Sequence, residues 1–326
     1  MTNNICVFIE TKDRSVRKAS FELLSKGKEI AEQVSSQLYA ILIGYNISSL
    51  TEELKPYAHT VVVVDNEALQ EYRWDTYGDV LEKLFKQYTP YLVFGASTTT
   101  GKDLFPRLAA RLKGYIISDA VGITLDGTQV KVKKPLFGGK ILSWFAYTGD
   151  RTLFVTFRPN SFAVSKGSYQ GEVRLEKIEC SHDERMHIIG IDKGGSKKVD
   201  LQEADFIICG GRGMKGPEHF QVLEEIADIM HGRVGASRAV VDSKWREYDD
   251  QIGKSGKTVS PKLYIGCGVS GALHHTMGMD TSKTIVAINK DPNAPIFQYA
   301  DYGIVDDIFT ILPVLKEKLK QAKGEV

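Results

Sequence analysis

Gly211-Arg212-Gly213-Met214-Lys215-Gly216 closely follows a short apolar run, Phe206–Cys209, and precedes a helical pattern. A second turn of the same form, Gly266-Cys267-Gly268-Val269-Ser270-Gly271, directly follows the apolar run Leu263–Ile265. A Gly-x-Gly-x-x-Gly turn between a strand and a helix lets the main chain approach the phosphates of a dinucleotide. One match is weak evidence. Two in a single C-terminal domain predict an α/β fold and a long, doubly phosphorylated ligand that lies across several strand ends.

The residues before these turns predict two kinds of sheet. From Ile5 to Phe94, apolar runs alternate with amphipathic stretches, which is typical of parallel strands joined by helices. Beyond Val121 the pattern changes to short strands separated by glycine or aspartate turns, which favours an antiparallel addition. The strands expected there are Val121–Leu125, Gln129–Lys133, Lys140–Tyr147, Thr152–Arg158 and Glu172–Cys180.

A polar, glycine-bearing segment without hydrophobic periodicity, Asp192–Lys198, predicts the domain boundary. We therefore expect an N-terminal α/β domain over residues 1–192, a linker over 193–201 and a doubly wound C-terminal domain over 202–326. In the C-terminal domain, Pro217 suits the first turn of a helix, and Asp306 or Asp307 suits a helix N-cap.

Composition limits the partners of the chain. The 326 residues carry a formal charge of +1, so no overall field attracts nucleic acid or an anionic membrane. The longest apolar runs fall well short of the roughly 20 residues that span a bilayer, which argues against an integral membrane protein. Four dispersed cysteines and a start without a leader pattern predict a cytoplasmic protein with free thiols and no metal site.

Polar residues follow several of the predicted strands, where open α/β sheets bind ligands. Arg212 lies inside the first glycine turn and can reach pyrophosphate oxygens, although a solvated loop arginine is the alternative. Ser237 and Arg238 follow a short strand, and for Arg238 the alternative is a helix-start arginine paired with a carboxylate. Asn289 and Asp307 are placed to hold an adenosine half, or else serve as turn and cap residues.

Other motifs indicate what the chain does not do. Gly95–Asp103 resembles a Walker loop but has five residues between its glycines and an aspartate where magnesium needs a hydroxyl, so nucleotide hydrolysis is rejected. Its remaining interpretations are a closely packed turn or a partner contact. His274 and His275 point about 100° apart on a helix and lack further ligands for a metal. No set of nucleophile, base and orienting residue is evident, which fits an electron carrier whose cofactor performs the chemistry.

At these residues the chain resembles the alpha subunit of electron transfer flavoproteins. The resemblance is dense from Cys209 to Pro313 and looser, though still present, in the N-terminal half. It rests on the order and spacing of Gly210–Gly213, Gly235–Arg238, Gly253–Lys257, Gly268–His275, Ile288–Asp291, Ala294–Phe297 and Ala300–Val305, with Gly95–Asp103 and Pro106–Ala109 earlier in the chain.

The resemblance implies a heterodimer in which the N-terminal domain contacts an electron transfer flavoprotein beta subunit and the C-terminal domain binds FAD. It implies electrons received from acyl-CoA or related dehydrogenases, as in fatty acid beta-oxidation, and passed to a membrane quinone oxidoreductase. The FAD-contacting residues it implies are Arg212, Ser237, Arg238, Gln251, Ile252, Gly253, Lys254, Ser255, Gly268, Ser270, Gly271, Ala272, Leu273, His274, His275, Asn289, Asp307 and Ile308.

The same resemblance assigns roles around the flavin ring. Ser255 would face flavin N5, His275 would lie at the flavin O2 side, and Arg238 would favour the reduced, anionic forms of the ring. Lys254 and Ser255 stand where the family usually has Gln and Thr, and His274 stands where it usually has Gln. These departures leave FAD binding expected and place the redox potential in question.

Two other functions stay open at this point. A bifurcating complex of the same family would oxidise NADH and reduce a low-potential acceptor, and the sequence of the beta subunit would distinguish it. From another class, the C-terminal domain would be an NAD-binding catalytic or regulatory module. That module should carry a nucleophilic lysine or an acid–base pair near the glycine turns, and neither can be assigned.

Overall fold

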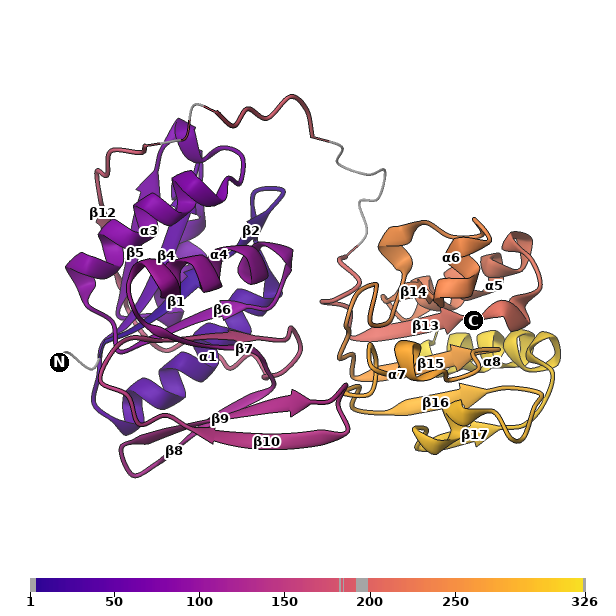
Figure 1. The fold of residues 1–326 in the computed structure, drawn as a ribbon. Helices are drawn as coiled ribbons and strands as arrows, with labels where there is room; N and C mark the ends of the chain where they lie inside the picture. Colours follow the sequence, from indigo (N-terminus) through magenta and orange to yellow (C-terminus); the bar gives the residue numbers. More distant parts are fainter. Residues whose placement is uncertain (1–3, 182, 184, 192–198, 325–326) are drawn as a thin grey trace. The chain divides into compact units, whose positions relative to one another are not determined.

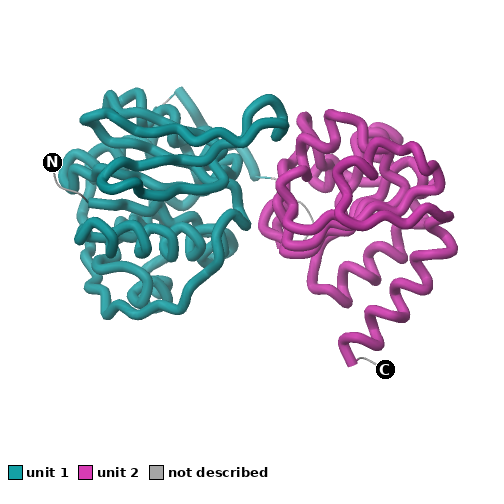
Figure 2. Tube along the Cα trace, turned by 90° about the horizontal axis from the view of Figure 1, so that it is seen from below, with its two compact units in different colours: residues 1–192 teal, residues 193–326 magenta. Residues whose placement is uncertain are grey.

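The computed structural model describes residues 4–181, 183, 185–191 and 199–324. The chain forms two compact units, residues 1–192 and 193–326 (Figure 2). Of the expected linker, 193–201, only residues 199–201 are among those that the structure describes. In the described part of the chain, no helix is both long enough and apolar enough to cross a membrane.

A parallel sheet forms the centre of the first unit (Figure 1). Its seven strands lie in the order β12-β5-β4-β1-β6-β11-β7, and every neighbouring pair runs parallel. The strands are β1 (Ile5–Ile9), β4 (Leu38–Gly44), β5 (Thr60–Asp65), β6 (Leu92–Ala96), β7 (Tyr115–Ala120), β11 (Leu153–Phe157) and β12 (Glu172–Leu175).

Helices cover both faces of this sheet, which explains why its central strands are continuous apolar runs. In β1, Ile5 and Val7 pack into the core on the side of α1 (Lys18–Gln33), whereas Cys6 and Phe8 pack into the core under α3 (Trp74–Tyr88) and α4 (Thr99–Arg111). Smaller elements of the unit are the pair β2 (Thr11–Lys12) and β3 (Ser15–Val16), and the short helix α2 (Thr51–Leu54).

The predicted antiparallel addition is confirmed for one part of the chain and wrong for another. β8 (Gly122–Asp126), β9 (Gln129–Leu136) and β10 (Ile141–Ala146) form a three-stranded antiparallel sheet. β11 and β12, which were expected to belong to it, run parallel in the large sheet instead, and β12 ends at Leu175 rather than at Cys180. All five residues of β11 are buried, which is the pattern of a strand covered on both faces.

The second unit contains a parallel sheet of five strands in the order β14-β13-β15-β16-β17. The strands are β13 (Phe206–Gly210), β14 (Arg233–Ala236), β15 (Leu263–Cys267), β16 (Ile285–Ile288) and β17 (Tyr302–Ile304). The chain leaves β13 toward β14 and then continues on the other side from β15 onward. This order gives the doubly wound fold that was predicted, with its topological switch point between β13 and β15.

Helices α5 (Gln221–Ile229) and α8 (Ile308–Lys323) pack against one face of this sheet in a shared core that includes Leu223 and Leu312. The predicted helix starts are confirmed: Pro217 opens the 3-10 turn before α5, and Asp307 caps α8 by accepting a 2.9 Å hydrogen bond from the N–H of Phe309. The short helices α6 (Arg238–Asp242) and α7 (Leu273–Thr276) follow directly on β14 and β15 at the carboxyl edge of the sheet.

Candidate functional site

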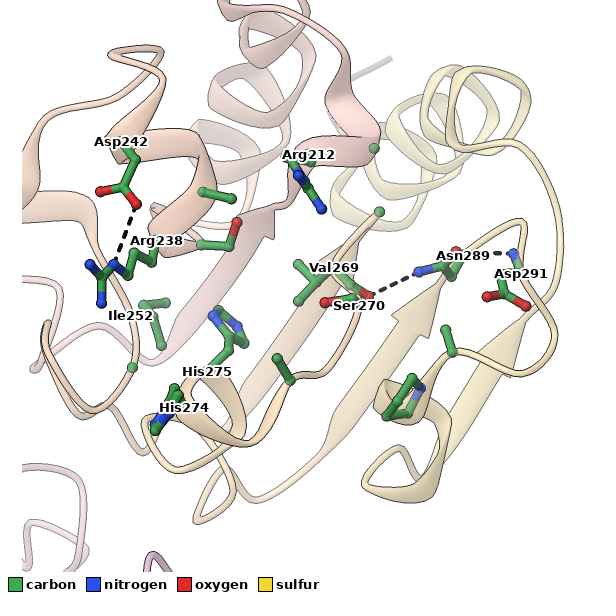
Figure 3. Close-up of a pocket in the computed structure, with 18 of the residues that line it drawn as sticks. Arg212, Arg238, Asp242, Ile252, Val269, Ser270, His274, His275, Asn289 and Asp291 are labelled. Carbon is green, nitrogen blue, oxygen red and sulfur yellow. Dashed lines mark hydrogen bonds and ion pairs between the residues drawn. The ribbon is translucent and has the colours of Figure 1, made fainter.

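A pocket of about 550 Å³ opens at the carboxyl edge of the second unit's sheet, across the switch point (Figure 3). The segments that follow β13, β14, β15 and β16 all line this pocket. Residues of the loop before β15 line it as well. Its lining is Arg212, Gly213, Ser237, Arg238, Ala239, Asp242, Ile252, Gly253, Ser255, Gly268, Val269, Ser270, Ala272, His274, His275, Asn289, Asp291, Ala294 and Pro295. Carboxyl ends of parallel strands at a switch point are where open α/β sheets bind ligands.

The structure brings most of the predicted residues together in this lining and leaves others beside it. The predicted residues in the lining are Arg212, Ser237, Arg238, Ile252, Gly253, Ser255, Gly268, Ser270, Ala272, His274, His275 and Asn289. Those outside it are Gln251, Lys254, Gly271, Leu273, Asp307 and Ile308. Asp307 caps α8 and Ile308 is buried in the core beneath it, so both have structural roles here.

The two glycine turns pack directly against each other. The N–H of Gly211 donates a 2.9 Å hydrogen bond to the carbonyl of Cys267, and the N–H of Gly213 donates one of 3.1 Å to the carbonyl of Gly268. A Cβ atom on Gly213 would lie 2.7 Å from the Cα of Gly268, which itself has φ +61°. Glycine is therefore required here by backbone contact. The N–H groups of Val269 and Ser270, which line the pocket, make no hydrogen bond to any described group.

Two arginines supply positive charge to the pocket. Arg212 is exposed and has no ion-pair partner among the described residues, so its guanidinium is available to an anion. Arg238, whose side chain is 71% exposed, has Nε at 3.3 Å from Oδ2 of Asp242, one helical turn further on. The pairing of Arg238 with a carboxylate, which the sequence left as its alternative role, is thus present. Asp242 also lines the pocket, and nothing in the sequence pattern singled it out.

Ser255 lies on the loop before β15 and is held by its neighbours. The side chain of Gln251 donates a 3.1 Å hydrogen bond to Oγ of Ser255, and the hydroxyl of Tyr248 donates to the Ser255 carbonyl. Gln251 is itself buried, so it positions Ser255 rather than lining the pocket. Lys254 is exposed beside it, with its main-chain N–H bonded to the carbonyl of His274.

A network of ion pairs, centred on the buried Asp250, holds the start of this loop. Asp250 accepts hydrogen bonds from Arg233 at 3.0 Å and from Nε of Arg246 at 2.9 Å, and Arg246 also pairs with Glu224 at 2.6 Å. These residues were not predicted as part of the site. Their signal in the sequence is only that Asp250 directly precedes Gln251.

The adjacent histidines have different surroundings. His274 is exposed, whereas His275 is buried and its Nε2 lies 2.8 Å from the hydroxyl of Tyr264. Burial lowers the pKa of His275 to about 4, an effect that the backbone of Ile252 opposes, so the imidazole is neutral at pH 7. Nδ1 of His275 is buried and has no hydrogen-bond partner among the described groups. Among the residues that the structure describes, no three His, Cys, Asp or Glu side chains cluster so that they could hold a metal ion.

Asn289 ties two turns at the edge of the pocket. Its Nδ2 donates a 2.9 Å hydrogen bond to the carbonyl of Val269, and its Oδ1 accepts one of 3.0 Å from the N–H of Asp291 (Figure 3). The side chain therefore fixes the turn after β15 relative to the turn after β16. This agrees with the turn role that the sequence left open.

The first unit also has a switch point, between β1 and β6, but its own side chains fill it. Glu10 is buried there, accepts a 2.7 Å hydrogen bond from the hydroxyl of Thr98 and pairs with Arg17 at 2.8 Å. A Cβ on Gly101 would lie 1.8 Å from the carbonyl oxygen of Ala96. The Walker-like segment is thus a closely packed turn in this unit, and a phosphate beside Thr98 would meet a carboxylate.

A doubly wound sheet, a pocket of this volume at its switch point, and donors without partners on both sides of that pocket define a nucleotide-binding α/β protein. The unpaired guanidinium of Arg212 and the free N–H groups of Val269 and Ser270 suit phosphate oxygens. The buried Nδ1 of His275 suits a polar atom of a ring. The donor set is therefore compatible with a dinucleotide such as FAD.

Comparison with known proteins identifies the family. Residues 5–182 match the electron transfer flavoprotein domain, and residues 200–280 match the electron transfer flavoprotein FAD-binding domain. The chain is 39% identical to electron transfer flavoprotein subunit alpha of Thermoanaerobacterium thermosaccharolyticum and 40% identical to that of Bacillus subtilis, in each case over 98% of both chains. It is 33% identical to acryloyl-CoA reductase electron transfer subunit beta of Anaerotignum propionicum, covering 98% of this chain and 96% of that one. The chain belongs to the family of electron transfer flavoprotein alpha subunits.

Proposed function

We propose that this chain binds FAD in the second unit's pocket and, paired with an electron transfer flavoprotein beta subunit, carries electrons from acyl-CoA-type dehydrogenases to a membrane quinone oxidoreductase. The observation that carries the proposal is the pocket itself, in which cationic and neutral donors converge at the switch point of a domain that matches an FAD-binding family. Fatty acid beta-oxidation is the process in which such a carrier would act, and the cytoplasm is its proposed location.

In this proposal each group of pocket residues has a separate task. Arg212 and the N–H groups of Val269 and Ser270 bind the phosphates. Ser255, held by Gln251, presents a hydroxyl to the ring edge, and His275 presents Nδ1. Arg238 provides positive charge that Asp242 partly offsets. FAD, when bound, supplies the reversible uptake of electrons, so the chain's task is to bind it, orient it and set its potential.

Exposed apolar side chains support the proposed heterodimer. In the hairpin formed by β9 and β10 of the first unit, Phe137 of the turn and Ile141, Leu142 and Trp144 of β10 are each about half exposed or more, from 49% to 76%. Neighbouring apolar residues exposed in this way are typical of protein contact surfaces. We propose that this hairpin contributes to the contact with the beta subunit.

The name of one relative supports redox exchange with an enzyme that acts on acyl-CoA compounds. Acryloyl-CoA reductase electron transfer subunit beta is named for transfer of electrons in acyl-CoA chemistry. Similarity over nearly the full length of both chains makes an acyl-CoA-type dehydrogenase a reasonable redox partner of this chain as well.

The cofactor can be tested on the chain co-expressed and purified with its beta subunit. We expect a yellow complex with a flavin absorption band that releases FAD when it is denatured. Identification of the released nucleotides would also show whether the beta subunit holds a second one. A colourless complex that retains NAD and takes up no added FAD would contradict the proposal and favour the nucleotide-binding enzyme module.

The redox role needs a second experiment on the same complex. Anaerobic addition of an acyl-CoA with its dehydrogenase should bleach the flavin band, whereas NADH alone should leave it unchanged. Bleaching by NADH, coupled to reduction of a low-potential acceptor, would favour the bifurcating alternative over the simple carrier.

A further inference from the structure

Behind the pocket, His275 is supported by a tyrosine that the sequence did not single out. Tyr264 lies in β15, is completely buried, and places its hydroxyl oxygen 2.8 Å from Nε2 of His275. On the neighbouring strand β13, Cys209 is also buried, and its Sγ lies 4.0 Å from the same Nε2. On the opposite side of the ring, Nδ1 is buried and makes no hydrogen bond of normal geometry to a described group. The backbone of Ile252, which lines the pocket together with His275, is the nearby polar group that favours a proton on this imidazole.

The three buried groups permit two arrangements of protons. In the first, the Tyr264 hydroxyl donates to Nε2, and Nδ1 carries the imidazole proton. In the second, Nε2 carries the proton and donates to the Tyr264 oxygen, so the tyrosine must donate elsewhere. The other neighbour of its hydroxyl is the Cys209 thiol, and sulfur is a weak acceptor.

The first arrangement satisfies the buried groups better. A neutral imidazole nitrogen is a strong acceptor for the phenol proton, and the weakly donating thiol of Cys209 keeps its own acceptor, the Gly210 carbonyl 4.0 Å from Sγ. Burial raises the pKa of Tyr264 well above its ordinary value, so the phenol keeps its proton. Burial lowers the pKa of His275, so the imidazole carries only one proton at neutral pH.

We propose that Tyr264 is a positioning residue that donates its hydroxyl hydrogen to Nε2 of His275, holding the neutral tautomer in which Nδ1–H points to the pocket. A hydrogen bond made to one ring nitrogen decides which nitrogen carries the proton, and so decides what the other can offer a ligand. The pocket thereby keeps a neutral donor at His275, suited to an oxygen that gains negative charge. The use of this donor by FAD rests on the proposed function, whereas the tautomer is a property of the chain itself.

The tautomer can be measured directly on the complex with its beta subunit after labelling the histidines with ¹⁵N. We expect at neutral pH that Nδ1 of His275 gives the signal of a protonated ring nitrogen and Nε2 that of an unprotonated one, with and without FAD. His275→Asn identifies the signal by its loss. A proton on Nε2 in the unsubstituted protein overturns the inference, whether or not the complex binds FAD. The expected tautomer in a complex that binds no FAD supports the inference and contradicts the proposed function instead.

Tyr264→Phe tests the cause of that tautomer. Without the phenol donor, we expect the Nδ1 and Nε2 signals to move toward each other as both tautomers become populated, and the Kd for FAD to rise roughly 3- to 10-fold, as for a lost hydrogen bond. Tyr77→Phe is the matched control, because it removes a tyrosine hydroxyl bonded to the Leu69 carbonyl in the first unit. It should leave the His275 signals unchanged. Unshifted His275 signals in Tyr264→Phe overturn the positioning role, and if this variant does not fold, the signals of the unsubstituted protein still decide the tautomer.

Discussion

The main-chain N–H of Gly213 donates a 3.1 Å hydrogen bond to the carbonyl oxygen of Gly268, which joins the turn after β13 to the turn after β15. These two strands flank the switch point of the sheet. Because neither glycine leaves room for a side chain, the two turns meet backbone to backbone. Arg212 on one turn and Ser270 on the other are thereby held on the same pocket.

This contact predicts a large effect of Gly268→Ala. The new Cβ would lie 2.8 Å from the Cα of Gly213, and Ala would have to adopt φ +61°. We expect a loss of about 2–4 kcal/mol in the free energy of unfolding, from overpacking together with left-handed strain, and loss of FAD on gel filtration. Gly127→Ala is the control, since Gly127 has φ +60° but no atom within 4 Å. It should cost only about 1–2 kcal/mol and keep the flavin. Equal effects of the two substitutions would contradict the role of the turn contact.

The architecture of the second unit could be predicted from sequence because each glycine turn stands between a strand and a helix or tight turn. Such turns occur at the carboxyl end of a strand, so Arg212, Ser237 and Ser270 were expected at one edge of the sheet. What the pattern could not give is that Gly213 and Gly268 contact each other. Contacts between segments distant in sequence leave no periodic signal.

The less predictable features all depend on tertiary context. Thr152–Arg158 has the length and turn-bounded pattern of a hairpin strand, yet β11 inserts between β6 and β7, where both of its faces are covered. Tyr264 and Asp250 read as ordinary core and loop residues in the sequence. Their roles become visible only when β15 brings Tyr264 to His275 and the chain folds Asp250 onto two arginines.

The pair of Arg238 and Asp242 predicts opposite shifts of the flavin midpoint potential. Arg238→Ala removes positive charge near the pocket and should lower the potential, whereas Asp242→Asn removes the carboxylate at 3.3 Å and should raise it. Both side chains are mostly exposed, so solvent screening limits each shift to roughly 20–60 mV. Spectroelectrochemical titration of the purified complex measures both. Shifts of the same sign would show that the substitutions act through structure rather than charge.

The buried His275 predicts a loss of stability in acid. Its pKa in the folded chain is about 4, below the ordinary 6.5, so the unfolded chain takes up the proton first as pH falls. The free energy of unfolding should be unaffected by this group above pH 6.5 and should fall between pH 6.5 and 4, by of order 3 kcal/mol in total. Urea titrations of the unsubstituted protein and His275→Asn across this range isolate the effect from that of the carboxylates. Parallel pH profiles would contradict a neutral, buried His275.

The filled switch point of the first unit predicts a purely structural role for Glu10. Glu10→Gln removes the negative charge from its buried pair with Arg17 and should lower the stability of the first unit by about 3 kcal/mol, because burial makes the loss of this counter-charge costly. Flavin content under native conditions should not change. Glu29→Gln, at a more exposed pair with Lys26, should have an effect below about 0.5 kcal/mol. Loss of bound nucleotide from the Glu10 variant alone would contradict the assignment of the ligand to the second unit.

The network under the pocket loop predicts that Asp250 supports FAD binding without touching the ligand. Asp250→Asn leaves the buried Arg233 and the partly buried Arg246 with less negative charge, which should cost about 3 kcal/mol of stability. Because Asp250 immediately precedes Gln251, whose side chain holds Ser255, the loop should also become less ordered and FAD should dissociate faster. Asp249→Asn is the matched control. The Asp249 carboxylate precedes Asp250 in the chain but is 78% exposed, and its Oδ1 lies 3.5 Å from Nζ of Lys257. Chemical unfolding and the rate of flavin release on dilution measure the two effects. An Asp250 variant that is destabilised yet releases FAD at the unsubstituted rate would show that the network stabilises the unit without ordering the loop.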